Sequence, residues 1–316
     1  MLQSLSLLVN LALLVMIGVS IVSWVRLLWS RRTLTGPELL ESLVPVRARR
    51  RPFWTIADAL LMFGMMILIG QAILRTMARK GWIEQVGGSD GDGELSPIGM
   101  LAFISANSLG GLIAVGVTLL WLRAFDANAR RRVGLRLSRE DFLLGLKGTV
   151  MILPPVMLIA AAVNLVVPYE HPVLESLEKV ATPAVLLATF VGTAIVTPIV
   201  EEFLARGLLQ GSLQAMADRG GDESPWYARA YDPDASLAKH DWKPHAWWPV
   251  VVSSLLFAMM HGGQGAAPIP LFVLSLGLGY LYRQTGSLGP PILVHMFLNG
   301  LTLTVQFLNL FNLPRS

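Results

Sequence analysis

The chain has 316 residues, of which 53% are hydrophobic and 15% charged, and its formal net charge is +4 at pH 7. Several apolar runs reach the roughly 20 residues needed to cross a bilayer, which argues against a soluble protein. The basic residues cluster beside these runs without interleaved aromatic residues, so nucleic acid is not an expected partner. The chain has no cysteine, which excludes disulfides, thiolate metal sites and a cysteine nucleophile.

The hydropathy pattern predicts an all-α fold, a polytopic membrane helical bundle with about eight transmembrane helices. Each predicted span is an apolar run bounded by charged residues, glycines or prolines. In chain order the predicted spans are Leu5–Trp29, Phe53–Met77, Ile98–Leu122, Phe142–Val167, Pro183–Met216, Trp247–His261, Pro268–Arg283 and Pro291–Leu310. Eight spans would place both termini on the same side of the membrane.

The spans fall into two predicted regions. Residues 1–141 form an N-terminal transmembrane region of about three spans with basic loops, and residues 142–316 form a core of about five spans with a polar insertion at 217–246. The basic clusters Arg47–Arg51 and Arg130–Arg136 flank spans two and three on one side. The positive-inside rule makes that side cytoplasmic, and we expect the protein in the cell membrane.

Charged residues inside the fifth span are the strongest functional signal. Glu201, Glu202 and Arg206 lie within an apolar run, where ionisable side chains are rare and indicate a functional site. Glu202 and Arg206 have i, i+4 spacing with the glutamate first, which predicts a structural ion pair. Glu201 points about 100° away around the helix and has no partner in its own segment.

Two later spans carry further polar residues. His261 ends the sixth span, and His295 and Asn299 share one helix face of the eighth because they are four residues apart. Helix rise places Glu201 about 22 Å and His261 about 21 Å from the cytoplasmic ends of their spans. We therefore expect these residues to meet in a cavity that opens to the cytoplasmic side.

Three motifs contain these residues: Glu201-Glu202-Phe-Leu-Ala-Arg206, Phe257-Ala-Met-Met-His261 and His295-Met-Phe-Leu-Asn299. In this order, each within an apolar segment, they resemble the CPBP family of intramembrane endopeptidases. That family includes the CAAX prenyl proteases and bacteriocin-processing or immunity homologues. The resemblance covers roughly Pro183–Leu310.

The resemblance implies a mechanism and a substrate class. Glu201 with His261 would activate a water molecule for attack on a peptide carbonyl, and His295 and Asn299 would stabilise the oxyanion. No cofactor is expected: Glu201, His261 and His295 would be the ligands of a zinc ion, but no H-E-x-x-H motif is present and Asn is an unusual zinc ligand. The substrate would be a peptide or membrane-protein segment in the bilayer. A prenylated C-a-a-X terminus is one case.

Two other classes of function are compatible with the motifs. A non-catalytic membrane scaffold or immunity protein of the same fold would keep the residues without using them for hydrolysis. A proton-coupled transporter would also place Glu and His inside the membrane. The absence of an inverted repeat between the two halves argues against the transporter.

Overall fold

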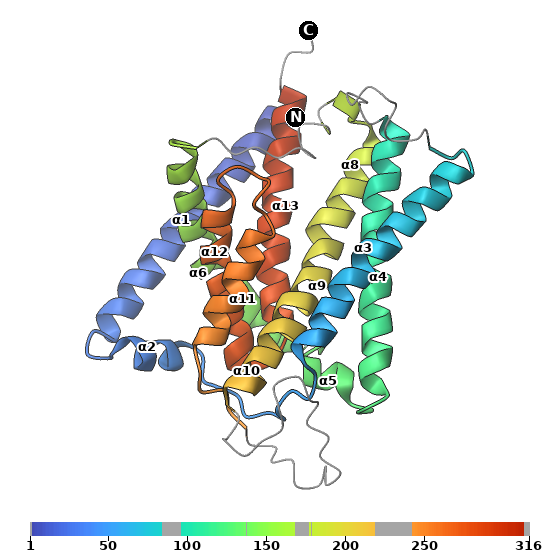
Figure 1. Cartoon of the computed structure of the whole chain (residues 1–316). Coiled ribbons are helices and arrows are strands. Elements are labelled where there is room, and N and C mark those ends of the chain that lie inside the picture. Colours follow the sequence, from blue (N-terminus) through green and yellow to red (C-terminus); the bar gives the residue numbers. More distant parts are fainter. Residues whose placement is uncertain are drawn as a thin grey trace.

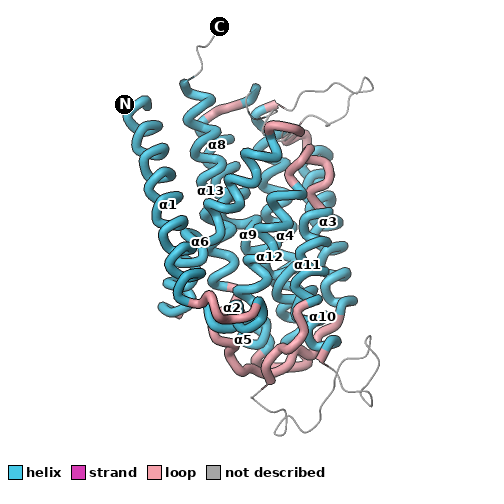
Figure 2. Tube along the Cα trace, turned by 90° about the vertical axis from the view of Figure 1, so that its left-hand side faces the viewer, coloured by secondary structure: helices cyan, strands magenta, loops and turns pink. Residues whose placement is uncertain are grey.

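The computed structural model describes residues 2–83, 96–136, 138–167, 177, 179–218 and 242–312. Within these ranges the secondary structure is helical and no strand is formed, which confirms the predicted all-α fold (Figure 2). Most of the predicted polar insertion, residues 219–241, lies outside the described residues. The predicted division at residue 141 stays a prediction.

The described helices form a bundle (Figure 1). In chain order they are α1 (Leu2–Ser30), α2 (Gly36–Leu43), α3 (Ile56–Arg79), α4 (Pro97–Arg123), α5 (Ala129–Val133), α6 (Arg139–Asn164), α8 (Pro183–Thr189), the π-helix η1 (Phe190–Val196), α9 (Thr197–Glu202), the π-helix η2 (Phe203–Gln210), α10 (Gly211–Ala217), α11 (Trp248–Met259), α12 (Pro268–Thr285) and α13 (Gly289–Asn312). The segments from α8 to α10 form one continuous helical run.

Six described helical runs are long and apolar enough to cross a membrane, and they correspond to predicted spans one to five and eight. Predicted spans six and seven, which are helices α11 and α12 in the structure, are not among these six. Helix α11 has 12 residues, about 18 Å, whereas the hydrocarbon core is about 30 Å thick. Helix α12 returns beside it, so α11 and α12 form a hairpin whose tip stops short of the end of the bundle at which α13 ends (Figure 1). His261 is at that tip.

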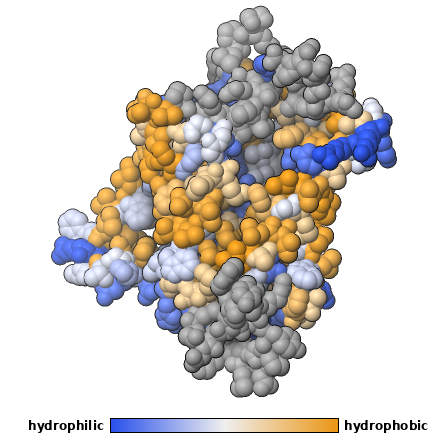
Figure 3. Space-filling view, in the orientation of Figure 1, coloured by the Kyte–Doolittle hydropathy of each residue, from blue (hydrophilic) through white to orange (hydrophobic). Residues whose placement is uncertain are grey.

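The surface of the bundle is suited to lipid. Large apolar side chains such as Leu14, Leu68 and Leu120 are exposed on the long helices. Figure 3 shows apolar residues across the middle of the molecule and hydrophilic residues nearer its ends. Because exposed apolar surface of this extent is unfavourable in water, this pattern fits an integral membrane protein.

Glycines bring α3, α4 and α9 close together at one level. A Cβ on Gly110 of α4 would lie 2.8 Å from the backbone nitrogen of Gly70 in α3. A Cβ on Gly111 would lie 2.9 Å from Cγ2 of Val200, next to Glu201. The glycines therefore fix the level of Glu201 beside Gly70, and beyond this level α3 leans away from α9 (Figure 1).

The two basic clusters lie at one end of the bundle, which we call the basic end (Figure 1). Some of their arginines are used internally. Arg47 pairs with the buried Asp141 at 2.7 Å, and the Arg49 guanidinium lies 5.2 Å from the ring centroid of Trp242 and 5.7 Å from that of Tyr282. Burial lowers the pKa of Arg49 to about 10, so it stays charged at neutral pH. The start of α1 and the end of α13 both lie at the opposite end.

Candidate active site

The helical run that carries the two glutamates contains two π-helical segments, η1 and η2. Glu201 and Glu202 close the short helix α9, which lies between the π-helices η1 and η2. Arg206 belongs to η2. π-helical turns are rare and are frequently found at functional sites. These π-helical segments thus lie at the residues that the sequence singles out.

Glu202 is fully buried and accepts hydrogen bonds from two helices. Arg206 Nε donates to its Oε2 at 3.0 Å, so the structure contains the predicted i, i+4 ion pair. The other oxygen, Oε1, lies 3.0 Å from Nδ1 of His295 in α13. A carboxylate only accepts, so Nδ1 of His295 carries a proton and Nε2 is left facing the site. Sequence reasoning missed this contact because it joins residues 93 positions apart.

The Arg206 guanidinium is buried beneath Glu202. Its Nη2 donates to Ser275 Oγ of α12 at 2.5 Å, and its centre lies 5.4 Å from the centroid of the Phe257 ring. Nη1 has no hydrogen-bond partner among the described residues and faces Gly279, where an added Cβ would be 3.3 Å away. The small residues of α12 are therefore needed because α12 approaches a buried arginine.

The F-x-x-x-H motif has a direct structural meaning. His261 Nδ1 donates to the backbone carbonyl of Phe257 at 2.9 Å, so Nε2 is free to accept a proton. The Phe257 ring lies 4.9 Å from the imidazole of His261 and 5.8 Å from that of His295. One aromatic ring therefore packs against both imidazoles.

Glu201 differs from Glu202 in exposure and in partners. Its side chain is 25% exposed, whereas that of Glu202 is 0% exposed. Its Oε2 lies 3.8 Å from Nε2 of His295, and its charge also interacts with His261. It makes no hydrogen bond within the described residues, so its carboxylate is available to a water molecule. The structure thus brings Glu201, His261 and His295 to one place.

Asn299 lies one helical turn beyond His295 on α13. Its Nδ2 donates to the backbone carbonyl of Thr193 in η1 at 2.9 Å. An amide nitrogen has two N–H groups, so one remains for another acceptor. The structure therefore places the fourth predicted site residue next to the π-helix that leads to Glu201.

The positions of the site residues can be compared with those needed to bind a metal ion. Within the described residues, no group of three or more His, Cys, Asp and Glu is arranged to hold a metal ion. Glu201, His261 and His295 lie near one another without forming such a ligand set. A metal-free mechanism remains a prediction.

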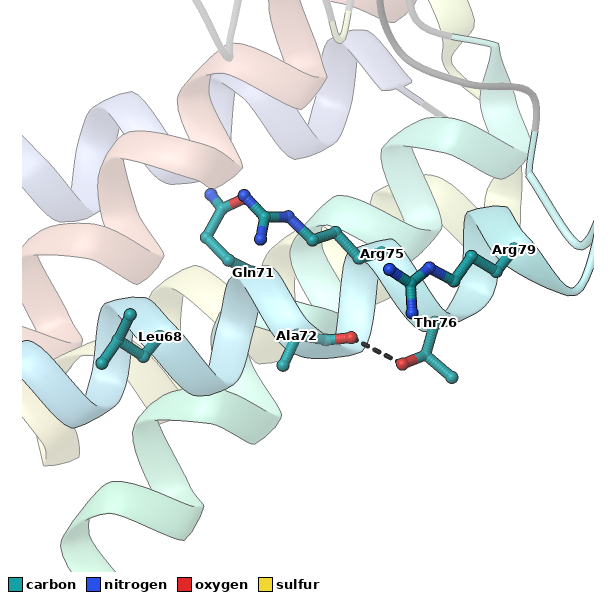
Figure 4. Close-up of a pocket in the computed structure, with 6 residues that line it drawn as sticks. All are labelled: Leu68, Gln71, Ala72, Arg75, Thr76 and Arg79. Atoms are coloured by element: carbon teal, nitrogen blue, oxygen red, sulfur yellow. Dashed lines mark hydrogen bonds between the residues drawn. The ribbon is translucent and has the colours of Figure 1, made fainter.

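A groove of about 330 Å³ lies on the outer part of α3 and is separate from this cluster (Figure 4). Its lining residues come from one face of the helix: Leu68, Gln71, Ala72, Arg75, Thr76 and Arg79. It contains no carboxylate or imidazole and is not a candidate for the hydrolytic centre. It extends along α3 from Leu68 to Arg79, so it begins near Gly70, at the level of Glu201.

Comparison with known proteins agrees with the motifs. Residues 183–301, which include all six predicted site residues, match the family model described as type II CAAX prenyl endopeptidase Rce1-like. No curated protein and no solved structure gives a significant match to the chain. This match confirms the resemblance predicted from the three motifs: residues 183–301 are similar to the Rce1-like family of type II CAAX prenyl endopeptidases.

Proposed function

We propose that this protein is an intramembrane endopeptidase that hydrolyses a peptide bond in a membrane-associated protein or peptide. The observation that carries the proposal is the buried polar cluster of Glu201, Glu202, His261 and His295 within apolar helices. Such groups are costly in a membrane, and here they converge on the Glu201 carboxylate, which makes no hydrogen bond to the residues that the structure describes. We place the protein in the cell membrane.

In this mechanism Glu201 and His261 act on one water molecule. Glu201 takes a proton as the water oxygen bonds to the scissile carbonyl carbon, which leaves a tetrahedral oxyanion. The second N–H of Asn299, and Nε2–H of His295 in its imidazolium form, would donate to that oxyanion. Glu201 then passes this proton to the leaving nitrogen as the C–N bond breaks, giving a carboxylic acid and an amine. Glu202 holds the His295 ring in orientation.

The substrate class follows from the family and the membrane. The family description names a prenylated C-terminal sequence, and we propose a membrane-associated peptide segment as the wider class. Purified protein in liposomes should cleave peptides of this class, tested with and without a farnesylated cysteine. Glu201→Gln should abolish cleavage, whereas Glu41→Gln on the exposed helix α2 should have no effect. Equal cleavage by Glu201→Gln would contradict the mechanism, and no cleavage by the wild type would favour a scaffold.

Burial favours access from the end opposite the basic end, in contrast to the cytoplasmic opening expected from the sequence. Below Glu202, towards the basic end, the polar side chains of Arg206, Gln210 and Gln214 are all buried. On the Glu201 face, Thr197 is half-buried one turn towards the opposite end, and Ala205 is buried one turn towards the basic end. We therefore propose that the mouth of the site lies on the Thr197 side.

Single-cysteine labelling tests this access route because the chain has no native cysteine. Thr33→Cys, in the exposed turn before α2, marks the basic end. A membrane-impermeant thiol reagent should label Thr197→Cys from the side on which Thr33→Cys is protected, and Ala205→Cys should stay unlabelled. Labelling of Thr197→Cys only from the side on which Thr33→Cys reacts would contradict this proposal and support the cytoplasmic opening expected from the sequence.

A further inference from the structure

The contact between α13 and η1 involves the backbone carbonyl of Thr193, for which the helical run of η1 supplies no N–H donor. In η1 the hydrogen bonds run five residues back, as in the bond from the Thr197 N–H to the Gly192 carbonyl. In the same register the next donor to the Thr193 carbonyl would be residue 198. That residue is Pro198, which has no N–H.

The missing donor is replaced by a side chain. Asn299 Nδ2 donates to the Thr193 carbonyl at 2.9 Å, across the contact between α13 and η1. An unpaired backbone carbonyl inside a membrane protein is unfavourable, so this bond has a strong reason to form. Within the described residues, it is the one hydrogen bond that the Asn299 side chain makes. One bond thus determines how the amide group is oriented.

The elements on both sides restrict η1. A Cβ on Gly192 would lie 2.8 Å from Ile104 Cγ2 of α4, so η1 is packed closely against α4. On the other side, a Cβ on Gly300 of α13 would be 3.9 Å from Ala194 Cβ. The Thr193 carbonyl is therefore a fixed acceptor, and an amide bound to it has a defined direction.

We propose that Pro198 is a positioning residue that acts through Asn299. By leaving the Thr193 carbonyl without a backbone donor, Pro198 reserves it for the Asn299 amide, whose second N–H is then aimed at the reacting carbonyl. The inference rests on the proposed function of Asn299 as an oxyanion donor. Pro198 itself touches no reacting atom, which is why its effect must disappear when Asn299 is absent.

A double-mutant cycle tests the coupling. Pro198→Ala supplies a new backbone N–H that competes for the Thr193 carbonyl, and removing a proline from a helix does not itself disfavour the helix. The kcat of Pro198→Ala should fall at least about tenfold. The largest expected fall is about 10²–10³-fold, the effect of losing a whole oxyanion donor, and KM should stay within about twofold of the wild type. In the Asn299→Ala background, Pro198→Ala should change kcat less than about twofold. Pro155→Ala, the same change within α6, is the matched control and should keep wild-type kcat.

Equal effects of Pro198→Ala in both backgrounds would overturn the proposal, because a purely structural role is additive. A second measurement does not depend on activity. The side-chain amide resonance of ¹⁵N-labelled Asn299, identified by its loss in Asn299→Ala, should shift in Pro198→Ala and not in Pro155→Ala. An unshifted resonance would reject the coupling even if the protein proved not to be a protease. An inactive wild type with a shifted resonance would reject only the proposed function.

Discussion

Replacing Glu202 by glutamine separates the roles of the two adjacent glutamates. Glu202 is fully buried and accepts from Arg206 Nε and His295 Nδ1, both at 3.0 Å. Glutamine keeps the shape but replaces one acceptor oxygen with an NH₂ group. That NH₂ group would face either an arginine N–H or an imidazole N–H, so two hydrogen-bond donors would face each other without an acceptor. The Arg206 guanidinium would also lose its counter-charge, although its Nη1 already has no partner among the described residues.

The magnitude follows from this burial. Breaking a buried ion pair by removing one partner costs about 3–5 kcal/mol, because the other charge stays desolvated. For a chain of this length a loss of 1 kcal/mol lowers Tm by about 2 °C, so Glu202→Gln should lower Tm by roughly 6–10 °C. Glu201→Gln removes a partly exposed carboxylate whose nearest basic atom is 3.8 Å away, and should cost less than about 1 kcal/mol.

Thermal unfolding in detergent, paired with peptide cleavage, measures both effects. Glu201→Gln should melt near the wild type and be inactive, and the exposed Glu41→Gln is the control for the substitution itself. The double variant Glu202→Gln, Arg206→Gln should be less destabilised than the sum of its single variants, since no unpaired charge remains. Large and equal destabilisation by Glu201→Gln and Glu202→Gln would refute the assignment of different roles.

Three other predictions concern the site and its support. Asn299→Ala should lower kcat about 10²–10³-fold with little change in KM, measured by steady-state kinetics; a rise in KM at unchanged kcat would instead indicate ground-state binding. Metal analysis of active, purified protein should find no stoichiometric zinc, and chelators should leave cleavage intact; activity that is lost on chelation and restored by zinc would contradict this. Gly279→Ala should destabilise the protein by about 1–3 kcal/mol, because its Cβ would lie 2.9 Å from Gln210 Oε1. Gly263→Ala, whose Cβ would have no atom of the described residues within 4 Å, should melt like the wild type.

Sequence reasoning succeeds where the information is local. The i, i+4 spacing of Glu202 and Arg206 predicts their ion pair, and the apolar runs predict six of the long helices. It fails for contacts that depend on how distant helices pack. The bond between Glu202 and His295 and the bond between Asn299 and Thr193 both join separate spans, and the spacing within one span cannot show which faces will meet.

Two further features had only weak signals in the sequence. An apolar run that ends in Gly262-Gly263 looks like a span, and only its 12 helical residues show that α11 is too short to cross the membrane. The Arg47–Arg51 cluster looks like an orientation signal. In the structure, however, Arg49 donates to the Arg283 carbonyl at 2.9 Å and to Gln214 Oε1 at 3.2 Å, beneath the site. A charge near a membrane boundary can therefore both orient a protein and close one end of its interior.

The burial of the polar side chains between Glu202 and the basic end explains why two adjacent glutamates have different environments. Both carboxylates belong to one helical turn, but Glu202 points into a packed interior where Arg206 and His295 occupy its oxygens. Glu201 points about 100° away, towards the side where Thr197 is half-buried and where we propose the mouth of the site. Because Arg206 neutralises Glu202, the remaining negative charge beside His295 is that of Glu201. A buried, neutralised carboxylate that orients an imidazole, next to a carboxylate that makes no hydrogen bond to the described residues, is an arrangement suited to activating water.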